Sequence, residues 1–415
     1  MVSVKYIISM KKFLPFLCVF MYFMSPYRLG GHEMPEIIGL FALFLAFLSK
    51  YKCFLPKSYV FYLVYIWLIP LFSSCICGIP GKYLLSAIPV ALILSTCYIG
   101  FLMPNLNKKL VLKYYRWLVY IAVAFFVIQE FSHIIIGYRP VFFLPFLEMY
   151  YEDSNSSSMA AIEVNSDRSA SFFLEPSHFV QYIIPYYCIS LSRYLKTKKN
   201  ILEILALTLV IIWLRAGVGY VALLAIGSFY FLRSGVMKMY QKIIIVVFVF
   251  AGYILLTTVY ANNEYVSAIL DRTSEFSMTV EESGSQSGFL RIWRGYFIYA
   301  SMNFASQLFG VGPGCLDYVC NAVIIPGTRY EGTYMNGIQL LLVTGGIVGL
   351  ILFFNYLFRF ARKLDVTGKC ILIAMICIFL MEHMYNTPKM FLYLLLASCF
   401  TIKKQRCKFK KKKIK

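Results

Sequence analysis

Long apolar runs alternate with short polar segments along the whole chain. Most runs contain fifteen or more residues, and a helix needs about 20 residues to cross a hydrocarbon core about 30 Å thick. This pattern predicts about twelve transmembrane helices. They are expected at residues 13–27, 36–49, 58–77, 83–103, 117–137, 179–195, 200–214, 217–232, 243–260, 334–358, 370–386 and 388–402.

The composition excludes a soluble protein. Of the 415 residues, 60% are hydrophobic and only 14% are charged, which is more apolar surface than one soluble core of this length buries. We therefore predict an all-α polytopic membrane protein in which residues 1–415 form a single integral membrane domain.

The net charge of +21 follows the predicted topology. If the N-terminus is cytoplasmic, the twelve helices place 30 of the 40 Lys and Arg residues on the inner side and 17 of the 19 Asp and Glu residues on the outer side. Short inner loops are rich in lysine, for example Lys108 to Arg116, as the positive-inside rule expects. The charge therefore predicts two cytoplasmic termini and gives no reason to expect nucleic-acid binding. The polybasic tail, 403–415, either contacts anionic lipid or acts only as a topology anchor.

Two segments on the predicted outer face are much longer than the others. They cover residues 138–178 and 261–333, and connections of this length are usually functional or disordered. The second contains an amphipathic stretch, Gly288 to Asn303, with an aromatic and basic composition suited to a helix at the membrane interface. We expect the function to lie in these outer segments.

Arginine dominates the basic residues of the predicted outer face, where eight of the ten cations are arginine. Its planar guanidinium group suits bidentate binding of phosphate or carboxylate. The alternative is that these arginines pair with the outer carboxylates. The candidates for binding a pyrophosphate group are Arg168, Arg215, Arg272, Arg291, Arg294 and Arg329.

The segment from Arg168 to His178 ends in the sequence Glu-Pro-Ser-His. Pro176 predicts the first turn of a helix, so free backbone N–H groups lie near Glu175 and His178. This arrangement is suited to binding an anion or to positioning a base, although Glu175 or Ser177 would serve equally well as a helix cap. Other ionisable residues near the outer ends of predicted helices are Glu130, His133, Glu382 and His383, of which His383 is the best placed.

Together these motifs resemble the O-antigen and capsule polymerases of the Wzy type. The resemblance covers roughly residues 165–390. It depends on the order of several loose motifs that all lie on the predicted outer side of the membrane. The matching motifs are Arg168 to Ser177, Arg215 at a tight turn, Arg291 to Arg294, Gly310 to Gly314, Tyr334 to Gly337, and Gly345 to Gly349. Leu214 departs from the pattern, because the family usually has a serine before the tight-turn arginine.

The resemblance implies a bundle of the GT-C type in the bacterial cytoplasmic membrane. It implies a metal-independent glycosyltransferase, without a cofactor, that joins undecaprenyl-pyrophosphate-linked repeat units into O-antigen, capsule or exopolysaccharide. Arg168, Arg215, Arg291 and Arg294 would stabilise the pyrophosphate leaving group, and Glu175 or His383 would act as general base. A chain-length regulator protein would be a possible partner. The alternatives are an O-antigen ligase and, from another class, a flippase for lipid-linked oligosaccharides.

Overall fold

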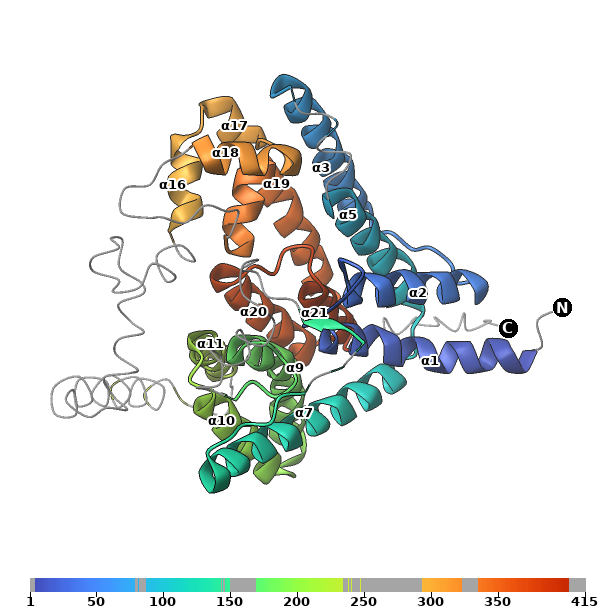
Figure 1. Ribbon diagram of the computed structural model, residues 1–415, viewed down its shortest axis with the longest axis vertical. Coiled ribbons are helices and arrows are strands. Elements are labelled where there is room, and N and C mark those ends of the chain that lie inside the picture. The colour runs from blue at the N-terminus through green and yellow to red at the C-terminus, as the bar shows by residue number, and fades with distance from the viewer. Residues whose placement is uncertain are drawn as a thin grey trace, which may run out of the picture.

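The chain folds mostly into helices, as the computed structural model in Figure 1 shows. The structure describes residues 4–78, 81, 87–142, 144, 146–149, 169–233, 238, 240, 247, 293–322 and 335–402. Every apolar run predicted within these ranges overlaps a helix, although the bounds differ by several residues at some ends. The ninth run, apart from residue 247, and the tail 403–415 lie outside the described residues.

The helices follow the order that the apolar runs predict. The longer ones are α1 (Val4–Phe23), α2 (Met34–Leu48), α3 (Lys57–Ile76), α5 (Ala87–Cys97), α7 (Lys108–Ile136), α9 (Pro176–Thr197), α10 (Ile201–Trp213), α11 (Gly217–Arg233), α19 (Gly337–Ala361), α20 (Val366–Met381) and α21 (Pro388–Ser398). The shorter elements are the π-helix η1 (Tyr98–Leu102), α6 (Met103–Asn105), α16 (Arg294–Ser301), α17 (Phe304–Phe309), the 3-10 helix η3 (Pro313–Cys315) and α18 (Leu316–Ala322). The described part of the chain is thus predominantly helical, and the number of membrane crossings stays a prediction.

Helix α7 is longer than hydropathy predicts. It begins at Lys108 rather than at residue 117, so the basic cluster from Lys108 to Arg116 lies in a helix and not in a loop. The Asn107 side chain caps the helix by accepting hydrogen bonds from the N–H groups of Lys109 and Leu110. Hydropathy ends a predicted helix where charge begins, but these residues contain no proline or glycine to break it.

A small sheet departs from the all-α prediction. Strand β1 (Tyr27–Leu29) pairs with β2 (His32–Glu33) and with β3 (Glu148–Met149), both antiparallel. The Tyr27 hydroxyl also donates to the Phe142 carbonyl at 2.9 Å. Two segments that the sequence predicts as separate loops on one side of the membrane therefore lie side by side, and their extended backbones satisfy each other's hydrogen bonds.

Three helices of the described residues are long and apolar enough to cross a membrane: α3, α7 and α19. Their outward faces carry apolar side chains, such as Ile76, which is 86% exposed, and Ile135, which is 75% exposed. A surface of this kind is costly in water and ordinary against lipid. The fold is therefore that expected of a helical membrane protein.

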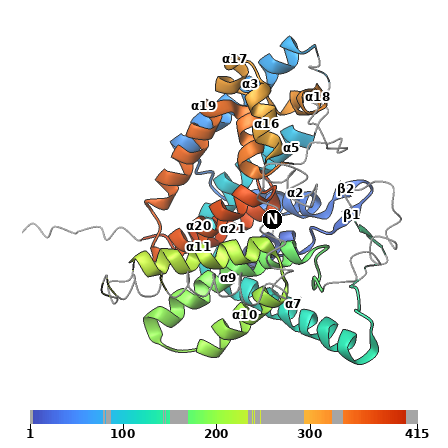
Figure 2. The same ribbon diagram turned by 90° about the vertical axis from the view of Figure 1, so that its left-hand side faces the viewer.

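The helices form two groups that meet in the middle of the molecule. In both views, α3, α5 and α16 to α19 lie in the upper part, and α7, α9, α10 and α11 lie in the lower part (Figures 1 and 2). Helix α20 packs against α19 of the upper group and against α9 and α11 of the lower group, while α21 packs against α9 and α1. The connection between α20 and α21 thus belongs to the junction of the two groups.

The two glycine motifs identified in the sequence pack against each other. The N–H groups of Val311 and Gly312 donate to the carbonyls of Val343 and Thr344 in α19, at 3.0 and 2.9 Å. Gly346 interrupts the α19 helix with a φ of 64°, a conformation that favours glycine. The glycine-rich turn therefore approaches the α19 backbone closely.

Replacing Gly346 by alanine is expected to destabilise the fold. An added Cβ would lie 2.3 Å from the Leu308 carbonyl oxygen, and the positive φ adds strain of about 1–3 kcal/mol. We expect a lower unfolding temperature of the purified protein in detergent, measured by intrinsic fluorescence. Gly227→Ala in α11 is the matched control, because a Cβ there meets nothing within 4 Å. Equal unfolding temperatures for the two variants would contradict the close packing.

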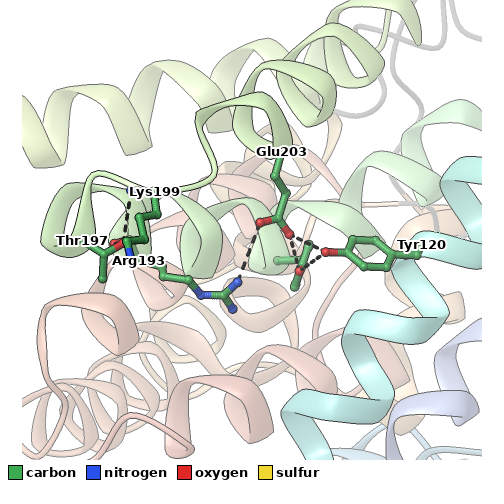
Figure 3. A network of polar contacts seen from close by, with 6 residues as sticks. Tyr120, Arg193, Thr197, Lys199 and Glu203 are labelled. Atoms are coloured by element: carbon green, nitrogen blue, oxygen red, sulfur yellow. Dashed lines mark hydrogen bonds and ion pairs between the residues drawn. The ribbon is translucent and has the colours of Figure 1, made fainter.

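A polar network ties α7, α9 and α10 together at the end where α10 begins. In Figure 3, Tyr120, Arg193 and Glu203 point toward one another. The Glu203 carboxylate accepts hydrogen bonds from the Tyr120 hydroxyl at 2.8 Å and from the Tyr186 hydroxyl, and it lies 3.7 Å from the Arg193 guanidinium. Because its charge is matched and hydrogen-bonded, Glu203 is explained as a structural link between the three helices.

Candidate functional site

Several of the predicted site residues come together where α9, α19 and α21 begin. We call residues 175–178, 336–339 and 382–389 the site region. The Tyr22 hydroxyl of α1 donates to the His178 carbonyl at 2.9 Å, and the Gly337 N–H donates to the Glu382 carbonyl at 3.0 Å. The first bond joins the start of α9 to α1, and the second joins the start of α19 to the loop after α20.

Helix α9 begins at Pro176, as the sequence predicts. Glu175 occupies the capping position, but its side chain makes no capping hydrogen bond to the helix. It accepts a hydrogen bond from the Ser177 hydroxyl at 3.0 Å instead. The interpretation of Glu175 as a side-chain cap is therefore wrong, and its carboxylate lies at the positive end of the α9 dipole.

The segment before α9 is held in place by α7. The Gln129 side chain accepts from the Ser171 N–H at 2.8 Å and donates to the Ser171 carbonyl at 3.2 Å. The Ser171 hydroxyl donates to the Ala122 carbonyl at 2.7 Å, and Ser171 has a φ of 58°. Because these groups are buried, the bonds fix the path of the chain into Glu175.

The N-termini of α9, α11 and α21 lie at the same height along the helix bundle. The Tyr393 hydroxyl donates to the Gln181 carbonyl at 2.7 Å, and both residues are the sixth of their helices, α21 and α9. A Cβ on Gly219, the third residue of α11, would lie 3.1 Å from Val180 of α9. The three positive helix ends are therefore side by side, an arrangement that favours an anionic ligand.

The connection from α20 to α21 lies at the centre of the site region. Helix α20 ends at Met381, because Glu382 adopts an extended backbone. Glu382 is only 6% exposed. Three residues later, the Tyr385 side chain is buried in the core. Its hydroxyl is hydrogen-bonded to the Tyr62 hydroxyl of α3, and its ring packs edge-on against Phe353 of α19. This short loop therefore contacts both groups of helices.

His383 lies beside Glu382, and its side chain is exposed. The surrounding protein atoms and the positive charge of Lys389 lower the pKa of its imidazole. The ring is therefore neutral at physiological pH. Protonation would place a second positive charge near Lys389, so His383 is better suited to hydrogen bonding than to accepting a proton.

Arg294 is the first residue of α16 and is buried, with 3% exposure. The next residue, Gly295, packs so tightly on α19 that a Cβ would lie 2.4 Å from the Gln339 Cβ. Gln339 belongs to the first turn of α19, whose Gly337 N–H binds the Glu382 carbonyl. One helical turn of α19 thus connects Arg294 with Glu382, and Arg294 lies beside the site region.

On the side of α18, Arg294 lies near the buried Cys320. Burial raises the pKa of the Cys320 thiol to about 11, and the nearby Arg294 charge opposes that rise. The predicted interfacial helix, Gly288 to Asn303, is observed only as α16, from Arg294 to Ser301. Its first part, with Arg291, lies outside the described residues.

Arg215 lies in the tight turn between α10 and α11, as predicted. Its side chain is exposed, and its φ of 47° is unusual for a residue with a Cβ. The turn is two residues from Gly217, where α11 begins beside α9. A strained backbone that presents an exposed guanidinium near a helix N-terminus is typical of a functional position.

The remaining predicted arginines cannot be placed. Arg168, Arg272, Arg291 and Arg329 all lie outside the described residues. The structure therefore places Glu175, His178 and His383 in the site region. Arg294 lies beside the α19 part of this region, and Arg215 lies in the turn before α11.

Glu130, one of the ionisable residues predicted near the outer ends of helices, makes structural contacts. The Glu130 carboxylate accepts from the Trp213 indole N–H at 2.7 Å and lies 3.7 Å from the Arg139 guanidinium. It thus links the end of α7 to the end of α10.

Three residues in or beside the site region were not among the predicted site residues. Tyr22 lies in an apolar run without any motif. Glu382 is visible as a carboxylate near the end of a run, but its neighbour His383 seemed better placed. Lys389 directly follows a helix-starting proline, the same signal that identified the start of α9.

Other features of the described residues do not suggest a second site. A hollow of about 500 Å³ between α3 and α5 is lined by apolar and uncharged side chains, including Trp67 and Ile93. Within the described ranges, no group of three or more His, Cys, Asp or Glu residues is arranged to hold a metal ion.

Comparison with protein-family models and with curated protein sequences finds no match for this chain. The class of the protein therefore rests on its own fold, which is that of a helical protein with membrane-type helices.

Proposed function

We propose that this protein is a glycosyltransferase that polymerises oligosaccharide repeat units linked to undecaprenyl pyrophosphate. The observation that carries the proposal is the composition of the site region. The positive ends of α9 and α21 and two carboxylates, Glu175 and Glu382, lie in this region, and the buried Arg294 lies beside it. Such a group can hold a pyrophosphate and accept a proton without a metal.

In the proposed reaction, a hydroxyl of the acceptor glycan attacks the anomeric carbon of the donor glycan. The bond between that carbon and the phosphate oxygen breaks, and its electron pair stays on the pyrophosphate. Negative charge therefore develops on the leaving group. Arg294 and Arg215 would stabilise this charge together with the N–H groups at the helix ends, because fixed donors need no reorganisation during the reaction.

The site would face the outer side of the bacterial cytoplasmic membrane, with both termini in the cytoplasm. Contacts between the ends of helices support this assignment. At the end opposite the site region, the Lys108 ammonium donates to the Ser398 carbonyl at 2.7 Å, and Lys196 lies 3.9 Å from Asp365. The charge pattern assigns these segments to the inner side, and it assigns the site region to the outer side.

The experiment that tests the proposal uses the purified full-length protein in vesicles with lipid-linked repeat units. We expect a ladder of lipid-linked products whose length increases with time, both with and without a chelator. A ladder that disappears with the chelator would contradict metal-independent transfer. Transfer of a complete glycan to a lipid A core acceptor, without a ladder, would identify an O-antigen ligase. Movement of lipid-linked oligosaccharide across the vesicle membrane without sugar transfer would identify a flippase.

A further inference from the structure

The backbone of Glu382 is held by hydrogen bonds on both of its sides. Its N–H donates to the Ile378 carbonyl of α20 at 2.8 Å, and its carbonyl accepts from the Gly337 N–H of α19 at 3.0 Å. Two helices thus hold one residue from both sides. A side chain on such a backbone is positioned far more precisely than one on a free loop, as a catalytic group requires.

Two carboxylates act on one tyrosine in this region. The Tyr22 hydroxyl is buried and lies within the electrostatic influence of Glu382 and of Glu175, with Glu382 having the larger effect. The Tyr22 proton is directed to the His178 carbonyl, at 2.9 Å, so it is not available to either carboxylate. Glu175 and Glu382 therefore both lie near one buried tyrosine.

The surroundings of the three candidate groups differ. Glu382 is a buried carboxylate on a backbone that two helices hold. His383 lies near the positive charge of Lys389, which opposes its protonation. Glu175 already accepts the Ser177 hydroxyl and lies at the positive end of α9, which stabilises its negative charge.

We infer that Glu382 is the general base of the transfer reaction, an assignment that rests on the proposed function. The acceptor oxygen forms its bond to the anomeric carbon while its proton passes to a Glu382 carboxylate oxygen. The electron pair of the broken bond stays on the pyrophosphate. Glu175 keeps its charge and helps to fix the first turn of α9, and His383 binds the glycan by hydrogen bonds.

The test compares Glu382→Gln with Glu175→Gln and with the unaltered protein, each purified at full length and supplied with lipid-linked repeat units. Glutamine keeps the size of the side chain but cannot take up the proton. We expect Glu382→Gln to reduce the polymerisation rate by about 10²-fold or more, with unchanged binding of the repeat unit and an unchanged unfolding temperature. Glu175→Gln is expected to have a clearly smaller effect on the rate.

A second variant keeps the inference testable if Glu382→Gln does not fold. Glu382→Asp keeps the carboxylate but withdraws it by one methylene, and it should retain activity that is measurable yet lower than that of the unaltered protein. A folded Glu382→Gln protein that polymerises at the unaltered rate, or a folded Glu382→Asp protein that is no more active than Glu382→Gln, would overturn the assignment and leave the proposed function intact. An unaltered protein that forms no ladder would overturn both.

Discussion

Arg294→Ala should lower the rate of glycan polymerisation by about 10²-fold, which is the usual cost of removing one well-placed donor to a developing negative charge. Arg294 is 3% exposed and is held beside the first turn of α19 by the packing of Gly295 against Gln339. Its guanidinium is therefore fixed before the substrate binds. The measurement is the rate of ladder formation by purified protein at saturating lipid-linked repeat unit.

The matched control for this prediction is Arg359→Ala. Arg359 lies near the far end of the same helix, α19, where its Nε donates to the Asn355 side chain at 3.1 Å. We expect its rate to stay within about twofold of the unaltered protein, because an exposed surface contact of this kind contributes little. Arg294→Lys separates charge from geometry, since lysine keeps the charge and loses the planar fork. Full activity of Arg294→Ala in a folded protein would remove Arg294 from the mechanism.

Arg215→Gly should decrease activity and at the same time maintain or increase stability. Glycine adopts the φ of 47° at this position without the strain that a Cβ imposes. The exposed guanidinium, however, is lost, and with it an expected factor of about 10² in the polymerisation rate. The two effects are measured on one sample, as ladder formation and as unfolding temperature.

Lys50→Gly is the matched control for Arg215→Gly. Lys50 has a similar φ of 53° and lies in the turn after α2, which the charge pattern places on the opposite side of the membrane. Its replacement should have the same effect on stability and no effect on the polymerisation rate. A loss of activity in Lys50→Gly as large as in Arg215→Gly would show that backbone strain, and not the guanidinium, accounts for the effect.

Helix positions could be predicted from the sequence because they depend on local properties. Within the described residues, apolar runs of sufficient length became helices, and prolines marked the first turns of α9 and α21. Boundaries at charged residues could not be predicted in this way. The start of α7 at Lys108 depends on the cap that Asn107 provides, and the end of α20 at Met381 depends on the bond between Glu382 and Gly337.

The candidate site could be predicted only in part. Motif reasoning identified Glu175, His178, His383 and Arg294, because proline-started helices and clustered arginines have recognisable chemistry. It could not place Glu382 in the site, since a carboxylate at the end of an apolar run gains its role only from its neighbours. Tyr22 lies hundreds of residues away in the sequence, and Gly337 belongs to another helix. No local sequence pattern connects either of them with Glu382.

The sequence by itself determined the helical class, the membrane-type hydropathy and the division of charge between lysine-rich and arginine-rich segments. These properties follow from residue composition over windows of about 20 residues, the length that a bilayer imposes. Only the tertiary structure decided that α9, α11 and α21 begin at one level, that two glycine motifs pack against each other, and that the Glu382 carbonyl is hydrogen-bonded to the first turn of α19. Such contacts arise from helix packing between distant segments, and one chain's sequence does not encode them in any local pattern.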